Sequence, residues 1–73
     1  MSRYIVYTKE KGKIKTDILG DFFGLTLHRL DGSAFLEFYD GRQLQYEWYY
    51  INGKCYNKSD YDAEIFKMKL ALL

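Results

Sequence analysis

Few side chains in this 73-residue sequence could carry out catalysis. A nucleophile would be Cys55 or a serine activated by His28, and no catalytic signature surrounds either residue. One histidine and one cysteine also fall short of the four ligands of a structural zinc site. Glu37 and Glu47 could form an acid–base pair, but alternation places them on the polar side of neighbouring strands, where solvated carboxylates are common. The sequence therefore predicts no enzyme, no metal and no cofactor.

Charged side chains are unevenly distributed along the chain, although its net charge is only +1. Residues 1–16 carry five cations and one acid, whereas residues 17–47 carry six acids and two cations. The small net charge argues against a nucleic-acid binder that uses its whole surface. Lys11, Lys13 and Lys15 either protect a sheet edge against aggregation or form a basic track for phosphates.

The elements that position these side chains are mostly strands, because apolar and polar residues alternate over short segments. The expected strands are Tyr4–Thr8, Lys13–Ile18, Phe22–Leu30, Ser33–Tyr39, Gln43–Ile51 and Lys54–Tyr56. Gly, Asn and Asp tolerate the positive φ of tight hairpins. They predict two-residue loops at Asp31-Gly32 and Asn52-Gly53, and a three-residue loop at Tyr39-Asp40-Gly41 with a G1 bulge at Gly41. These loops imply three facing pairs: Leu27 with Leu36, Leu36 with Leu44, and Tyr50 with Cys55.

After residue 57 the apolar residues change from strand spacing to helix spacing. Ser59 is followed by acids, as at a helix N-cap. An apolar stripe then predicts an amphipathic helix over residues 60–72. The stripe is formed by Tyr61, Ile65, Met68 and Leu72 and widened by Phe66, Leu70 and Leu73. We expect this helix to pack on the sheet face that carries Leu25, Leu27, Leu36, Phe38, Leu44, Tyr46 and Trp48.

The sequence thus predicts a single α+β domain. It would consist of an antiparallel β-meander of five to six short strands over residues 3–57, with one C-terminal amphipathic helix packed on one sheet face. The other face mixes aromatic and polar side chains, and it is the expected binding surface. Phe35, Tyr39 and Tyr49 would form its aromatic platform, and His28 lies on the same face. In an alternative arrangement the sheet curls, and the N-terminal strands cover part of this face.

Residues 27–54 resemble one unit of the MORN-like tandem β-repeats of small bacterial, phage and giant-virus proteins. The similarity is carried by the stretches Leu27–Ala34, Glu37–Gly41 and Tyr46–Lys54. Ser33 stands where the repeat usually has proline, the unit occurs once, and residues 1–26 lie outside the resemblance. The resemblance implies a β-meander from a phage-like or bacterial source, and it implies no activity.

These features predict a small non-enzymatic protein-binding module, such as a phage-encoded inhibitor that covers the surface of a host or bacterial protein. The alternative is nucleic-acid or nucleotide binding through the aromatic face and the N-terminal lysines. A homo-oligomer that shelters a ligand between subunits is a third hypothesis. No apolar run reaches the ~18–20 residues that span a bilayer, and the first residues do not form a signal peptide. We therefore expect a cytoplasmic protein with no membrane partner, in the host cytoplasm if it is phage-encoded.

Overall fold

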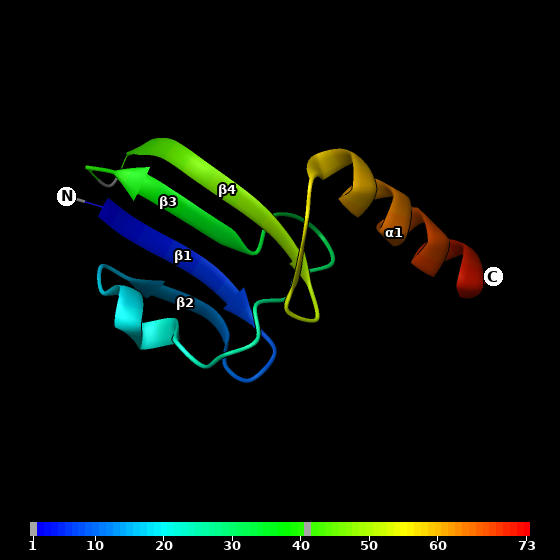
Figure 1. Ribbon diagram of the computed structural model, residues 1–73, viewed down its shortest axis with the longest axis horizontal. Coiled ribbons are helices and arrows are strands. Elements are labelled where there is room, and N and C mark those ends of the chain that lie inside the picture. Colours follow the sequence, from blue (N-terminus) through cyan, green and yellow to red (C-terminus); the bar gives the residue numbers. More distant parts are fainter. Residues whose placement is uncertain (1, 41) are drawn as a thin grey trace.

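The computed structural model describes residues 2–40 and 42–73, and it shows one open antiparallel sheet followed by a helix (Figure 1). The strands lie in the order β2-β1-β3-β4-β5. This arrangement confirms the predicted α+β class. In chain order the elements are β1 (Ser2–Thr8), β2 (Gly12–Thr16), the short 3-10 helix η1 (Leu19–Phe22), β3 (Phe35–Tyr39), β4 (Gln43–Ile51), β5 (Lys54–Tyr56) and α1 (Lys58–Ala71).

The strands β3, β4 and β5 form a meander, and the β1–β2 hairpin joins it by pairing β1 with β3. The turn between β4 and β5 is the predicted one, with Tyr50 opposite Cys55. Both turn residues have the positive φ of a type I′ turn, at 51° for Asn52 and 82° for Gly53. The chemistry of two adjacent residues is therefore sufficient to set this hairpin.

The predicted strand Phe22–Leu30 is wrong. Phe22 ends η1, and the chain then runs as a loop to β3, joined to β1 by a single bridge between Leu27 and Thr8. The apolar side chains of this segment instead form a lid over β1 and β2. The core consists of Tyr4, Val6 and Phe22, with Ile14, Leu25, Leu27 and Phe35 packed around them.

The predicted two-residue turn at Asp31-Gly32 is also wrong, because the strand expected before it is absent. Leu27 does not face Leu36, which pairs with Ile5 of β1. The β1–β2 hairpin thus occupies the place beside β3 that the prediction assigned to residues 22–30. Residues 22–30 bury apolar side chains from a loop that packs on the sheet, and such packing can use alternating residues without a paired strand.

The pairing of β3 with β4 also differs from the predicted register. Leu36 faces Glu47 and not Leu44 for two reasons. Tyr39, which the prediction assigned to the loop, pairs with Gln43, so the register is already displaced at the turn. β4 then contains an irregularity, where Phe38 faces Leu44 and Glu37 faces Tyr46. One extra residue in β4, at position 45, is the signature of a β-bulge. The predicted G1 bulge at position 41 lies outside the described residues.

The bulge and the pairing define two sheet faces, since facing residues in an antiparallel sheet share a face. The covered face lies on the side of η1 and carries Tyr4, Val6, Phe35 and Trp48. The open face carries Ile5, Leu36, Phe38 and Leu44. The apolar residues predicted to share one face beneath the helix are therefore divided between two faces and the loop.

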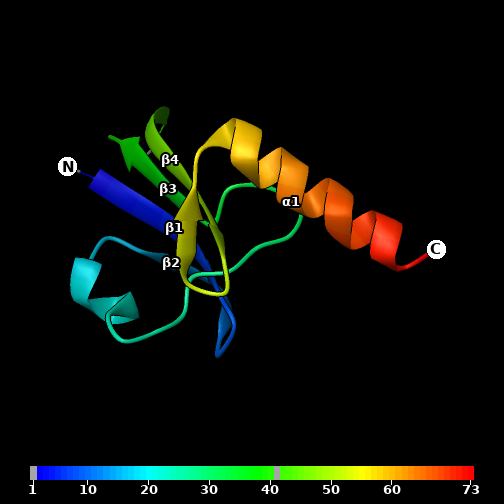
Figure 2. The ribbon, with the colours of Figure 1, turned by 45° about the vertical axis from the view of Figure 1, so that its right-hand side comes forward.

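The helix α1 begins two residues earlier than predicted, at Lys58. Asn57, not Ser59, is the N-cap, and its side-chain oxygen accepts a hydrogen bond from the Asp60 backbone N–H at 2.8 Å. Because Asn57 alone links β5 to α1, the helix starts at the end of the sheet. It contacts the sheet through Tyr61, whose ring lies 4.8 Å from that of Tyr49, and then projects beyond it (Figure 2).

The predicted packing of the helix along a sheet face is therefore wrong, although the helix itself is present. Tyr61 is 3% exposed, whereas Leu72 is 87% exposed. No helix within residues 2–40 and 42–73 is long and apolar enough to cross a membrane.

Candidate binding surfaces

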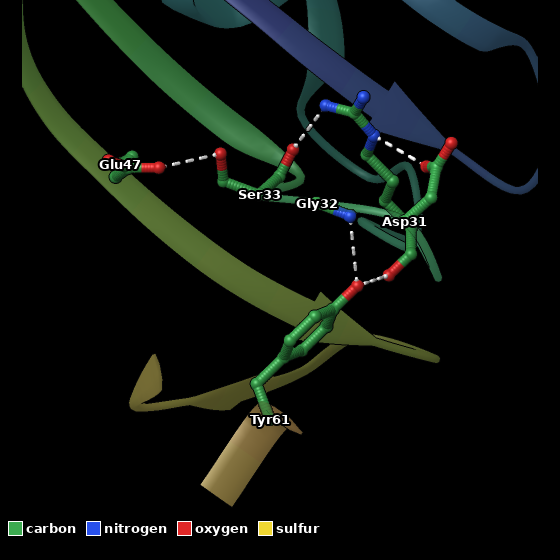
Figure 3. A network of polar contacts seen from close by, with 6 residues as sticks. Asp31, Gly32, Ser33, Glu47 and Tyr61 are labelled. Atoms are coloured by element: carbon green, nitrogen blue, oxygen red, sulfur yellow. Dashed lines mark hydrogen bonds and ion pairs between the residues drawn. The ribbon is translucent and has the colours of Figure 1, made fainter. Parts of the chain in front are cut away.

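A polar network joins the loop before β3 to β4 and α1 (Figure 3). The Tyr61 hydroxyl donates to the Arg29 carbonyl at 2.6 Å and accepts from the Gly32 N–H at 3.2 Å. Ser33 is buried, and its hydroxyl donates to the Glu47 carboxylate at 2.9 Å. We call Arg29, Asp31, Gly32, Ser33, Glu47 and Tyr61 the Arg29 network.

Arg29 organises this network through three different contacts. Its guanidinium donates to the Asp31 carboxylate at 2.8 Å and to the Ser33 carbonyl at 3.0 Å. It also stacks on Tyr7, with the guanidinium carbon 3.9 Å from the ring centroid. The hydrogen bond from Arg29, followed by its charge, lowers the pKa of Asp31. Several residues of the segment 27–54, which resembles the MORN-like repeat, therefore hold the fold together through these contacts.

His28 has a structural role in the same region. Its Nδ1 accepts a hydrogen bond from the Asn52 backbone N–H at 2.9 Å, while the Leu27 carbonyl accepts from the Gly53 N–H at 2.8 Å. These bonds hold the loop against the β4–β5 turn and engage the nitrogen that the prediction assigned to binding. Because Glu37 and Glu47 lie on opposite faces, they cannot act as an acid–base pair.

The structure does not bring the three predicted platform aromatics together. Phe35 belongs to the core, with its ring 5.8 Å from that of Tyr4 and 6.0 Å from that of Phe22. Tyr39 is exposed at the end of β3, on the covered face. Tyr49 lies on the open face against Tyr61, and burial, followed by the nearby Glu47 charge, raises its pKa.

The predicted lysines lie at the β2 side of the sheet. Lys13 and Lys15 face Tyr7 and Ile5, so both belong to the open face, and Lys11 lies in the turn before β2. Two strands, β1 and β3, separate β2 from β4. The lysines and the exposed aromatic side chains of β4 therefore do not form one surface.

Sequence reasoning missed two exposed aromatic side chains of β4, Tyr46 and Trp48, by assigning both to the face beneath the helix. They are 57% and 48% exposed, and they lie on the half of the covered face that the loop of residues 22–30 does not reach. In the described residues, no strand pairs with positions 43–48 of β4 on the side away from β3. We call this segment, with Tyr46 and Trp48, the β4 edge.

One sequence signal distinguishes the β4 edge. Glu47 is the single charged residue in the nine residues of β4, whereas β2 contains two lysines in five. Charged side chains, lysine above all, protect exposed edges from pairing with other chains. A strand that lacks them is therefore expected either in the middle of a sheet or at an edge that binds another chain.

Two hollows accompany these surfaces. One, of about 470 Å³, lies on the sheet near the start of β1 and is lined by residues that include Arg3, Ile5, Lys15 and Phe38. The other, of about 540 Å³, lies between α1 and the Arg29 network, and we call it the α1 hollow. Within the described residues, no three or more His, Cys, Asp or Glu side chains are grouped to hold a metal ion.

The fold and these surfaces define a small α+β protein with one unprotected sheet edge and a projecting helix. Comparison with protein families, with curated proteins and with solved structures finds no match to this chain.

Proposed function

We propose that this protein is a non-enzymatic binding module that recognises another protein along the β4 edge. The observation that carries the proposal is that, among the described residues, positions 43–48 have no neighbouring strand on the side away from β3, beside the exposed rings of Tyr46 and Trp48. An extended segment of a partner can add to such an edge through main-chain hydrogen bonds, while neighbouring side chains supply specificity. Tyrosine and tryptophan are also the side chains that most often dominate binding energy.

In this proposal the partner is a host or bacterial protein, and binding inhibits it by covering the surface that it uses. Strand addition would place the partner segment alongside β4, next to the rings of Tyr46 and Trp48. The resemblance of residues 27–54 to phage and bacterial repeats supports a phage-encoded inhibitor as the particular form of this function.

The separation of cations from aromatics disfavours nucleic acid as the ligand. Single-strand binders combine a basic groove with stacking rings along one path. Here Lys13 and Lys15 lie on β2 and face the open side, whereas Tyr46 and Trp48 lie on β4 and face the covered side. A bound strand would have to pass around the sheet to use both sets.

The test is an affinity capture from bacterial lysate with the full chain, followed by measurement of binding to the purified partner. We expect Trp48→Ala to weaken binding at least tenfold, because it removes an exposed ring at the centre of the proposed contact. Phe23→Ala is the matched control, since Phe23 is 74% exposed on the loop after η1, away from the β4 edge.

Two outcomes contradict the proposal. Equal binding by Trp48→Ala and Phe23→Ala would show that the β4 edge is not the contact. Salt-sensitive binding to oligonucleotides that is lost when Lys11 and Lys13 are reversed in charge would instead assign the protein to nucleic-acid binding.

A further inference from the structure

The projecting part of α1 exposes apolar side chains that its own domain does not cover. Tyr61, Ile65, Met68 and Leu72 follow the four–three–four spacing by which helices pair. Tyr61 is buried against the sheet, Ile65 and Met68 are half-buried, and Leu72 is 87% exposed. The stripe therefore begins inside the domain and continues out of it, as Figure 1 shows for the helix.

We infer that this protein forms a symmetric dimer through two antiparallel α1 helices, with Leu72 of each copy docked in the α1 hollow of the other. This inference uses other side chains than the β4 edge does. Glu47 belongs to that segment and also lines the α1 hollow, but Tyr46 and Trp48 lie on the covered face, whereas Tyr49 of the hollow lies on the open face. A second copy is the occupant because the charges of α1 complement those of the same helix in reverse. The first half carries Lys58, Asp60, Asp62 and Glu64, a net charge of −2, and the second half carries Lys67 and Lys69, a net charge of +2. Within one chain Lys58 pairs with Asp62 at 2.7 Å and Lys67 with Glu64 at 3.5 Å, so the complementarity lies in the net charge of each half.

The register of the two helices follows from the apolar stripe. When Ile65 lies level with the partner's Met68, Tyr61 lies level with the partner's Leu72. Asp62 and the partner's Lys69 are then on the same flank of the stripe, offset by about 3 Å along the axis at 1.5 Å rise per residue. The pairing occurs twice by symmetry. The opposed helix dipoles also place each negative end near a positive one.

The α1 hollow supplies a docking place at the level that this register requires. Its apolar lining is formed by Tyr61, Ile65 and Phe66 of the helix together with Leu30 and Tyr49. Charged side chains line it as well: Arg29, Asp31, Glu47, Lys58, Asp62 and Lys69. A pair of 14-residue helices forms only a short contact on its own. Insertion of Leu72 into the hollow extends the contact onto the loop and β4.

The antiparallel arrangement is favoured over the parallel one by the position of the sheet. In a parallel pair both sheets would lie at the same end of the helices, and each Leu72 would lie beside another Leu72, far from either hollow. In the antiparallel pair the sheets lie at opposite ends, and both hollows are filled. Such an interface is isologous, so it closes at two copies and does not propagate.

The first test is the molar mass of the full chain in solution, measured by sedimentation equilibrium from micromolar to millimolar concentration. We expect a reversible monomer–dimer equilibrium whose dissociation constant rises at least tenfold in Leu72→Asp. Leu70→Asp is the matched control, because Leu70 is an exposed leucine of the same helix that points to nearly the opposite side from Leu72. Circular dichroism checks that both variants keep the helix.

The second test is a charge exchange. Asp62→Lys and Lys69→Asp should each weaken the dimer, and the double variant should restore it, because opposite charges face each other again. The Lys67→Asp control has the same charge change as Lys69→Asp on the opposite flank, and we expect it to leave the dimer intact. Rescue by the double variant requires the antiparallel register, since in a parallel pair the two positions would not meet.

Three outcomes overturn the inference: a wild-type chain that stays monomeric over the whole concentration range, a dimer that is indifferent to Leu72→Asp, or a double charge variant that is no tighter than its single parents. A dimer that is lost in Trp48→Ala and kept in Leu72→Asp would move the self-association to the β4 edge. Failure of partner binding at the β4 edge leaves these measurements unchanged, so the two proposals can fail separately.

Discussion

The two sides of the sheet are held and protected in different ways. The β2 side rests on an apolar core, in which Phe22 closes over Tyr4 and Val6, and its outer strand carries Lys13 and Lys15. The β4 side lacks such a lid. It is joined to α1 and to the loop before β3 by the hydrogen bonds of the Arg29 network, and its outer strand exposes aromatic rings.

This difference indicates that the residues expected to supply most of the stability lie on a different side of the sheet from the residues proposed to bind. Lysines on an exposed strand discourage pairing with other chains, and an apolar lid gives that side the larger share of buried surface. A polar network holds geometry while contributing less free energy than a core of the same size. The less buried side therefore has the free edge, the exposed rings and the uncovered helix, and both proposed contacts lie there.

The largest effect is expected from breaking the β2 side. Phe22→Ala removes a buried ring from a core with few members, and comparable substitutions cost about 3–5 kcal/mol. This loss is a large fraction of the stability of a small domain, so we expect partial or complete unfolding. Urea denaturation followed by Trp48 fluorescence measures it. The control Phe23→Ala, at an exposed position, should change the free energy of unfolding by less than about 0.5 kcal/mol.

A smaller effect is expected from breaking the β4 side at Tyr61. Tyr61→Phe keeps the ring but removes the hydroxyl that joins the Arg29 carbonyl to the Gly32 N–H. Leaving such backbone groups without a partner costs about 1–3 kcal/mol. Tyr46→Phe, at an exposed tyrosine of β4, is the control in the same denaturation experiment. Equal stability of the two variants would show that the network does not hold α1 to the sheet.

A lysine introduced at the β4 edge, like those that β2 carries, should weaken binding and leave the free energy of unfolding unchanged. Tyr46→Lys places a lysine on an exposed edge position, as Lys13 does on β2. We expect partner capture to be lost while the free energy of unfolding changes by less than about 0.5 kcal/mol. Isothermal titration calorimetry and urea denaturation measure the two quantities. If the Tyr46→Lys variant still captures the partner, the proposed difference in function between the β4 edge and the β2 edge is wrong.

The smallest effect is expected from pH, because the carboxylates concerned are exposed. Each side holds one carboxyl with a lowered pKa: Glu10, which accepts hydrogen bonds from Thr26, and Asp31, which accepts from Arg29. A pKa that is lowered on folding adds stability at neutral pH, and this stability is lost as the pH falls through the folded-state pKa. We expect Asp31→Asn to be less stable than the wild type at neutral pH. The difference in the free energy of unfolding should shrink in acid. A difference that does not change with pH would show that Asp31 stabilises through the shape of its side chain and not through its charge.

Local signals predicted the elements whose geometry is decided within a few residues. The β4–β5 turn, the short strand Lys54–Tyr56 and the strand at the start of the chain were all predicted correctly. The helix was also correct, although its cap is Asn57 and not Ser59. In these cases positive φ at Asn52 and Gly53, or the spacing of apolar side chains, determines the backbone directly.

The binding surfaces were harder to predict, because exposure depends on which element covers a face. Tyr46 and Trp48 have the alternation of buried residues, yet the helix that was expected to cover them projects away. Phe35 has the alternation of the opposite face, and it lies in the core because the loop of residues 22–30 packs there. One extra residue in β4 also places Leu44 and Tyr46 on opposite faces of the sheet, although their spacing in the sequence predicts that they share one face.

The sequence by itself determined the α+β class, the turn at Asn52-Gly53 and the presence of a C-terminal helix, because each follows from dihedral preferences or periodicity along the chain. The tertiary structure alone decided that residues 22–30 form a lid and that β1 lies beside β3. It also decided that α1 leaves the sheet after Tyr61. These choices depend on contacts between residues far apart in the sequence, where several partners of similar hydrophobicity compete and only the packed whole selects among them.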